Sequence, residues 1–61
     1  MEYNIGDVVY LRTDPDQNER IVTGIRLRQN SITYLISYNV NESEHFDFEI
    51  AKDANILKKL N

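Results

Sequence analysis

The chain has 61 residues, of which 41% are hydrophobic, with no cysteine and a single histidine. We therefore expect one small domain, residues 1–61, without disulfides, cofactors or a multi-histidine metal site. The net charge of −3 disfavours general attraction to nucleic acid, no apolar run is long enough to span a membrane, and residues 1–4 lack a secretory leader pattern, so we expect a cytoplasmic protein.

The first predicted strand covers residues 6–12 and opens with a Gly-Asp turn. Val9 and Leu11 share one face of this strand by alternation, which makes both of them candidates for the core. Residues 13–18 form the clearest break in the chain, because Pro15 fixes its own backbone and lacks an N–H donor, while the neighbouring Asp and Asn side chains bond nearby amides. We expect a loop there.

The second predicted strand, residues 20–29, changes its alternation near the middle. Strict alternation places Val22 with the arginines and opposite Ile25. Gly24 is a natural site for a β-bulge, so we predict that the register switches there and that Val22 and Ile25 both point inward. A tight turn at residues 29–31 then closes a hairpin.

The third predicted strand, residues 32–40, has the cleanest alternation in the chain. Its more apolar face consists of Ile32, Tyr34, Ile36 and Tyr38. Residues 41–44 are predicted to be an acidic loop and residues 45–50 a fourth strand. The apolar face of that fourth strand would consist of Phe46, Phe48 and Ile50.

The tail changes its hydrophobic period from that of a strand to that of a helix. Ile56, Leu57 and Leu60 fall on one side of a short helix, and Asp53 is its predicted N-cap. We expect this helical turn to plug one open end of a small barrel.

These features resemble the SH3-like barrel superfold. The resemblance rests on Ile5-Gly6-Asp7-Val8-Val9-Tyr10 and on residues 21–25, 34–38 and 45–50, and it is closest to Tudor-like and KOW-like members and to short uncharacterised bacterial or mobile-element proteins. It implies an all-β fold, a small SH3-like barrel of four to five antiparallel strands with a short C-terminal helical turn. Members of this superfold bind peptides, methylated side chains or nucleic acid, so the resemblance does not select the ligand. The chain has no tryptophan, which disfavours recognition of proline-rich peptides.

The leading hypothesis is a non-catalytic interaction module that binds another protein. The contact would use an edge strand, the loops at residues 13–19 and 41–44, and the tyrosines expected to be exposed. The candidate partner-binding residues are Tyr3, Tyr10, Asp14, Asp16, Glu42, Glu44 and His45. A homo-oligomer is one form of this hypothesis, because a small domain with an unprotected edge invites self-pairing.

An arginine strip supports the alternative, which is nucleic-acid binding. Arg20, Arg26 and Arg28 share parity on the second strand, and Arg12 lies on the first. Such a strip beside an aromatic ring suits a phosphate backbone with a stacked base, although the negative net charge opposes this function. The competing interpretation is an outer sheet face on which the arginines pair with cross-strand carboxylates such as Asp47 and Glu49.

Three further patterns favour ordinary structural roles. Aromatic residues beside a carboxylate could cage a cation, but their spacing favours the core. Asp14-Pro15-Asp16-Gln17-Asn18 resembles the start of a calcium loop, yet Glu19 stands where that loop needs glycine. His45 has acidic neighbours but no evident nucleophile cradle, so we expect that the protein is not an enzyme.

Overall fold

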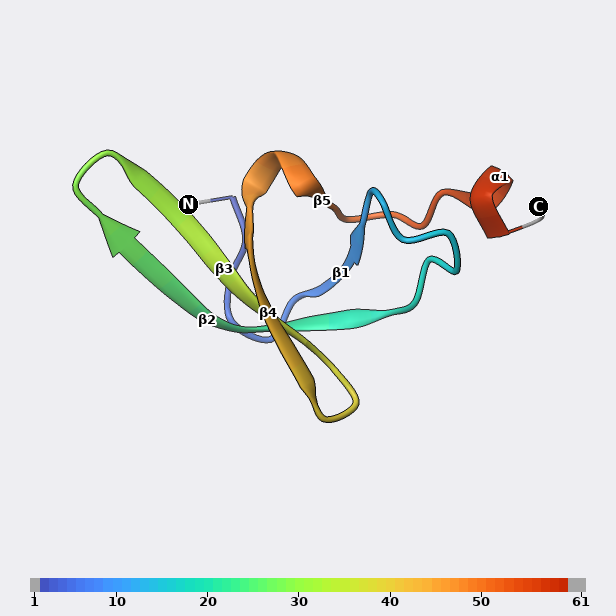
Figure 1. The fold of residues 1–61 in the computed structure, drawn as a ribbon, viewed down its shortest axis with the longest axis horizontal. Helices are drawn as coiled ribbons and strands as arrows, with labels where there is room; N and C mark the ends of the chain where they lie inside the picture. The colour runs from blue at the N-terminus through green and yellow to red at the C-terminus, as the bar shows by residue number, and fades with distance from the viewer. Residues whose placement is uncertain (1, 60–61) are drawn as a thin grey trace.

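The computed structural model describes residues 2–59, and they form one antiparallel sheet with two short helical turns. Figure 1 shows the elements in chain order. They are β1 (Val8–Leu11), β2 (Arg20–Arg28), β3 (Ser31–Tyr38), β4 (Asn41–Phe46), the 3₁₀ turn η1 (Asp47–Glu49), β5 (Ile50–Ala51) and α1 (Ile56–Lys59). The predicted mostly-β class with five antiparallel strands is confirmed.

The sheet has the order β4-β3-β2-β1-β5 and is not closed into a barrel. The recorded pairings join β1 with β2, β1 with β5, β2 with β3, and β3 with β4. Within residues 2–59, β4 and β5 are thus the two ends of the sheet, and no ladder joins them. The prediction of a closed barrel is not supported.

The long strand β2 bends because it contains a β-bulge. Its register against β3 shifts between Val22 and Gly24, as predicted. A Cβ at Gly24 would lie 2.9 Å from Leu35 Cδ1, so the absent side chain permits the close approach of β3. Because the bulge inserts one residue, Val22 and Ile25 both face the core, and this prediction is confirmed.

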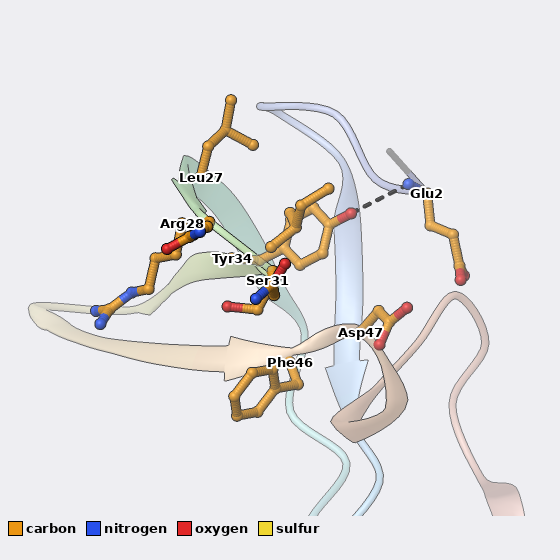
Figure 2. A pocket seen from close by; sticks show the side chains of 10 residues that line it. Glu2, Leu27, Arg28, Ser31, Tyr34, Phe46 and Asp47 are labelled. Atoms are coloured by element: carbon orange, nitrogen blue, oxygen red, sulfur yellow. Dashed lines mark hydrogen bonds between the residues drawn. The ribbon is translucent and has the colours of Figure 1, made fainter.

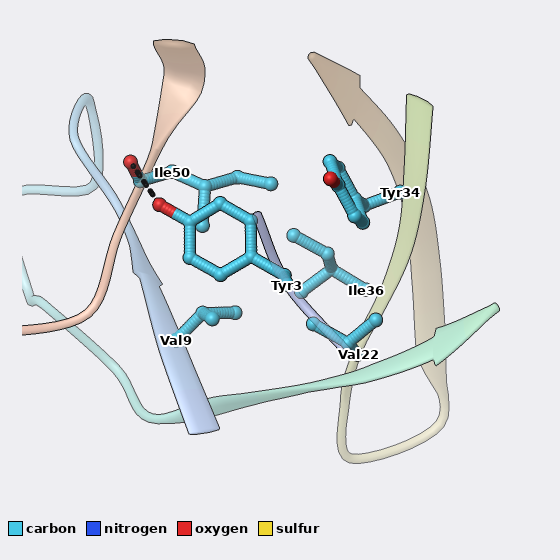
Figure 3. Packing of buried hydrophobic residues seen from close by; sticks show 6 residues of the cluster. All are labelled: Tyr3, Val9, Val22, Tyr34, Ile36 and Ile50. Atoms are coloured by element: carbon cyan, nitrogen blue, oxygen red, sulfur yellow. Dashed lines mark hydrogen bonds between the residues drawn. The ribbon is translucent and has the colours of Figure 1, made fainter. Parts of the chain in front are cut away.

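The core is a cluster of six side chains from five segments. Its members, drawn in Figure 3, are Tyr3, Val9, Val22, Tyr34, Ile36 and Ile50. The rings of Tyr3 and Tyr34 meet edge to face with their centroids 5.2 Å apart, a favourable aromatic geometry. Leu11 and Ile25 pack against the cluster from its margin. The N-terminal segment therefore covers the sheet by means of the Tyr3 ring.

The two hairpins have two-residue turns. Residues 29 and 30 connect β2 with β3, within the predicted range, and residues 39 and 40 connect β3 with β4. Asn39 has a φ of 54°, which asparagine tolerates better than most residues. The predicted acidic loop at residues 41–44 is wrong, since these residues are paired along β4 as far as Glu44↔Leu35.

The predicted fourth strand at residues 45–50 is also wrong, because η1 interrupts it. Glu49 Oε1 accepts a hydrogen bond from the backbone N–H of Phe46 at 3.0 Å, and the N–H of Ile50 bonds to the carbonyl of Asp47. These contacts turn the chain between β4 and β5. As a result Phe46, Phe48 and Ile50 do not share a face.

The tail does not plug the sheet. Asn55 rather than Asp53 caps α1, since Asn55 Oδ1 accepts a hydrogen bond from the N–H of Leu57 at 3.1 Å. Ile56 and Leu57 are 66% and 74% exposed. Leu60 lies outside the described residues. In the described part of the chain, no helix is long and apolar enough to cross a membrane.

Candidate protein-binding groove

The β2–β3 hairpin carries apolar side chains on its core face well beyond the core. Val22 and Ile36 are cross-strand partners, and both are fully buried. Nearer the turn, Leu27 and Ile32 are partners on the same face, but Leu27 is 68% exposed and Ile32 38%. The end of the hairpin therefore presents an apolar surface that the rest of the described chain does not cover.

This surface is one wall of an open groove, which Figure 2 shows from close by. The groove runs between the tip of the hairpin, the N-terminal segment and the start of η1. Its apolar lining comprises Leu27, Ile32, Tyr34 and Phe46, and its charged lining comprises Glu2, Arg28 and Asp47. Tyr34 forms the buried floor, and its hydroxyl accepts a hydrogen bond from the backbone N–H of Glu2 at 3.0 Å. Two carboxylates thus lie across an apolar floor from the hairpin.

Phe46, which lines the groove, forms an exposed aromatic pair with Phe48 at the end of β4. The rings of Phe46 and Phe48 stack with centroids 5.4 Å apart and an angle of 7° between their planes. Phe46 is 42% exposed and Phe48 69%. The expectation that these rings fill the core is wrong, because η1 directs Phe48 away from the sheet. They extend the apolar surface next to the groove.

The two tyrosines that were expected to be exposed differ in their burial. Tyr3 is only 4% exposed, and its hydroxyl donates to the carbonyl of Ile50 at 3.2 Å. Burial raises the pKa of the Tyr3 phenol above its ordinary value. Tyr10 is half-buried on β1. The prediction for Tyr3 is wrong: the sequence around it is polar, yet its ring caps the core.

The β2 bulge divides the predicted arginine strip. Arg20 precedes the bulge and pairs with the buried Val9, so it begins on the core side of the sheet. Arg26 and Arg28 follow the bulge on the outer face, alternating with core-facing residues. Arg12 lies just beyond the end of β1. The inference that the three β2 arginines share one face is wrong, because it assumed unbroken alternation.

Glu44 on β4 neutralises the two outer arginines. Its carboxylate lies 3.5 Å from Arg26 Nη1 and 3.3 Å from Arg28 Nη2, and it also accepts a hydrogen bond from the Thr33 hydroxyl. The Thr33 hydrogen bond, followed by the two arginines, lowers the pKa of Glu44 below its ordinary value. Cross-strand pairing of these arginines with carboxylates was expected, but the partner is Glu44 rather than Asp47 or Glu49.

Glu42 occupies the same outer face one step along the strand. Its carboxylate accepts a hydrogen bond from the Thr23 hydroxyl at 2.7 Å and a longer one from the Ser37 hydroxyl at 3.5 Å. Glu42 and Glu44 therefore belong to a cross-strand polar network on an edge strand, and they lie outside the groove lining. The predicted acidic binding loop does not exist in this form.

The loop after β1 is organised around Asp14. Its carboxylate accepts hydrogen bonds from the N–H groups of Asp16 and Asn18 at 2.9 and 3.0 Å and from Arg20 at 3.0 Å. Burial raises the pKa of Asp14, but the hydrogen bonds outweigh it and hold the pKa below its ordinary value. Asp16 is exposed. A carboxylate occupied in this way serves the loop, which supports the turn interpretation over a calcium loop.

Gln17 is a buried polar residue that the sequence analysis did not single out. It is 1% exposed, and its amide nitrogen donates to the carbonyls of Leu11 and Asp14 at 2.8 and 2.7 Å. Its amide oxygen accepts from the N–H of Asn55 at 2.7 Å. Gln17 thus ties the loop to the chain just before α1. Gln17 has a φ of 48°, and no pattern in the sequence indicates this left-handed backbone or the burial of its side chain.

Ser43, His45 and Glu49 form a hydrogen-bonded chain. His45 Nε2 lies 2.6 Å from the Ser43 hydroxyl, and His45 Nδ1 lies 2.9 Å from Glu49 Oε2. The His45 hydrogen bond is the main cause that lowers the pKa of Glu49. Ser43 is exposed on the edge strand β4, and the hydrogen-bonded chain runs from it through His45 to η1. It fixes the β4–η1 turn.

Residues 2–59 hold no cluster of three or more histidine, cysteine or acidic side chains with the geometry of a metal site. No family model matches the chain, and neither a curated protein nor a solved structure matches it significantly.

Proposed function

We propose that the chain is a non-catalytic protein-interaction module of the small SH3-like type, and that its ligand occupies the groove at the end of the β2–β3 hairpin. The observation that carries this proposal is that the cross-strand pair Leu27 and Ile32 is exposed. Ile36, four residues further along β3 on the same face, is fully buried. Apolar side chains that converge on a groove with a few charged groups at its rim are typical of binding sites.

Three features support the SH3-like assignment. The Gly-Asp opening forms a tight turn, in which Gly6 has a φ of 99° and Asp7 Oδ2 accepts from the N–H of Asn4 at 2.9 Å. The second strand bends at Gly24, and a short helical turn follows the last strand. Because the sheet is open, the groove between the end of the β2–β3 hairpin and η1 is accessible to a ligand.

An extended peptide segment is the ligand that suits the groove best. Among the described residues, β1 pairs only with the beginning of β2, at Arg20 and Ile21. The second half of β2 therefore has β3 as its single partner strand. An extended segment beside this half of β2 could add backbone hydrogen bonds while it inserts an apolar side chain over Leu27 and Ile32. The rim carries two carboxylates, Glu2 and Asp47, against one arginine, Arg28, whose charge is shared with Glu44, so the balance favours a ligand with basic residues.

A random-sequence peptide display selection tests this function. We expect enrichment of peptides that combine apolar and basic residues, and loss of their binding in the double variant Leu27→Thr/Ile32→Thr. Threonine keeps the β-propensity of both positions, and neither side chain is buried, so the variant should fold. Val40→Thr is the matched control, since Val40 is 97% exposed in the other hairpin turn. Absence of enrichment, or equal binding to the groove variant, would reject the proposal.

Nucleic-acid binding is the weaker candidate. Arg26 and Arg28 share one carboxylate partner, and Arg20 lies on the other side of the sheet. A fluorescence anisotropy titration with single-stranded DNA and RNA at low salt checks it, with Arg26→Ala/Arg28→Ala as the control. Salt-sensitive binding that this double variant abolishes would restore the nucleic-acid hypothesis.

A further inference from the structure

The chain has a second exposed apolar element, the tail at α1, and nothing in the described structure covers it. Ile56 and Leu57 are 66% and 74% exposed. They precede Lys58 and Lys59 in the sequence, so the tail is both apolar and basic. This composition matches the ligand that the groove favours. The tail supplies an apolar insert for Leu27 and Ile32, and a positive charge for a rim on which two carboxylates outnumber the single arginine.

The tail is held away from the groove of its own chain. The N–H of Asn55 donates to Gln17 Oε1 at 2.7 Å, and Lys58 Nζ donates to the carbonyl of Arg12 at 2.6 Å. Both contacts fix α1 beside the loop that follows β1. Figure 1 shows α1 at one end of the longest axis of the molecule, which measures 39 Å, and the β2–β3 turn at the opposite end. Docking within one chain would require both contacts to break.

We propose that the groove at the end of the β2–β3 hairpin accepts the Ile56–Leu57 tail of a second copy of this chain, in a reciprocal two-fold dimer. Two copies lying side by side in opposite directions bring each tail to the groove of the other copy, so both contacts form at once and the assembly closes. The proposal rests on the proposed function of the groove and names its occupant. Because each contact is small, the dimer is expected to be weak and to form at high micromolar to millimolar concentration.

Sedimentation equilibrium of the full chain across this concentration range is the first measurement. We expect a reversible rise in mass from the 7.2 kDa monomer to the dimer. The tail variant Ile56→Ser/Leu57→Ser and the groove variant Leu27→Thr/Ile32→Thr should each raise the dimer dissociation constant at least about tenfold. Val40→Thr should leave it unchanged. Circular dichroism of each variant checks that the sheet remains folded.

Mixing the two defective variants tests reciprocity directly. The tail variant keeps an intact groove and the groove variant an intact tail, so a mixed pair retains one of the two contacts. The mixture should therefore associate more strongly than either variant alone. A mixture that associates no better than its components would contradict the reciprocal arrangement.

Paramagnetic relaxation enhancement locates the contact. The chain has no cysteine, so Asp53→Cys provides a single site for a nitroxide label next to the tail. Spin-labelled protein mixed with ¹⁵N-labelled wild type should broaden the amide signals of Leu27 and Ile32, and leave that of Val40 sharp. The broadening should disappear when the spin-labelled copy also carries Ile56→Ser/Leu57→Ser.

Two outcomes would overturn the proposal: a monomer at every concentration, or a dimer whose broadened signals lie along β4. Neither outcome decides the proposed function, because the peptide selection reports on the groove separately. A monomeric chain whose groove still binds selected peptides would keep the groove and reject the second copy as its occupant.

Discussion

The two halves of the β2–β3 hairpin both carry apolar side chains on the core face of the sheet, but these side chains are buried in one half and exposed in the other. In the half beside β1, Val22 and Ile36 are both fully buried, because the Tyr3 ring and Ile50 cover them. In the half beside the turn, the equivalent pair Leu27 and Ile32 faces solvent. Alternation tells which face is apolar, whereas coverage depends on segments that are distant in the sequence. The exposed half carries the groove that we propose as the binding site.

Replacing one isoleucine in each half gives the largest expected effect. Ile36→Ala should lower the free energy of unfolding by about 2–5 kcal/mol, because it leaves a cavity in a core of six side chains. Ile32→Ala, on the same strand and face, should cost less than about 1 kcal/mol, since that side chain is 38% exposed. Urea unfolding followed by circular dichroism measures both. Equal losses would mean that the groove half is covered in solution.

Two arginines extend the comparison to charged groups. Arg20→Ala should destabilise the fold by about 1–3 kcal/mol, because it removes a charged hydrogen bond to Asp14, whose side chain is only 8% exposed. The Arg20 guanidinium also lies 5.2 Å from the centroid of the Tyr38 ring, a contact that alanine loses. Arg26→Ala should change stability by less than about 0.5 kcal/mol, since its pair with Glu44 is exposed. Thermal unfolding compares the two, and a larger loss for Arg26→Ala would contradict this assignment.

Tyr34 lies at the boundary between the two halves. Tyr34→Phe keeps the ring in the core but removes the hydroxyl that accepts the N–H of Glu2. We expect a loss of about 1 kcal/mol and faster amide hydrogen exchange at Glu2, because one rim of the groove is released. Unchanged exchange would show that this hydrogen bond does not hold the N-terminal segment. Tyr3→Phe serves as the control, since its hydroxyl bonds to Ile50 instead.

The smallest expected effect is a change in the pKa of Glu49. It tests the hydrogen bonds that hold the β4–η1 turn, and this turn places Asp47 at the rim of the groove. The ordinary value for glutamate is 4.5, and the His45 hydrogen bond lowers the folded-state pKa below it. Its contribution to stability is therefore present above about pH 4.5 and is lost as the pH falls through the folded pKa. His45→Gln should bring the Glu49 pKa closer to 4.5, as measured by ¹³C NMR titration of the carboxyl groups.

Glu44 supplies the internal reference in that titration. Its lowered pKa depends first on Thr33 and then on the two arginines, so His45→Gln should not move it. A Glu49 pKa that stays low in the variant would assign the shift to the N–H of Phe46 instead.

The sequence allowed the prediction of much of the sheet. We predicted the bulge at Gly24, the inward orientation of Val22 and Ile25, and the turn after β2. These features were predictable because hydrophobic alternation and the position of a glycine depend on the local backbone. The 3₁₀ turn was missed, since Phe46-Asp47-Phe48-Glu49-Ile50 alternates as a strand does, and only the Glu49 hydrogen bonds break it. We predicted a loop at residues 41–44 because acidic residues and asparagine have low β-propensity. Their pairing with β3 outweighs this propensity and makes them part of β4.

The candidate site was less predictable than the fold. Leu27 and Ile32 appeared as ordinary members of apolar faces, and no local pattern shows that covering segments end before they reach these residues. Tyr3 was expected to be exposed, and no local pattern in its part of the sequence indicates that its ring is buried. A long-range contact, the edge-to-face packing against Tyr34, decides its position.

The outer face of β4 has a consequence for aggregation. Glu42 and Glu44 stand one step apart on the strand that ends the sheet. If two copies joined edge to edge at β4, Glu44 would stay paired with Arg26 and Arg28. The Glu42 carboxylate of each copy hydrogen-bonds to the hydroxyl groups of Thr23 and Ser37, so it would add uncompensated negative charge along the joined edge and oppose growth of a continuous intermolecular sheet. Because the pKa of Glu44 is lowered, its pairs with Arg26 and Arg28 persist further into acidic solution than those of an ordinary glutamate would. The protein can thus present an apolar groove at one end while its strand edge resists fibril formation.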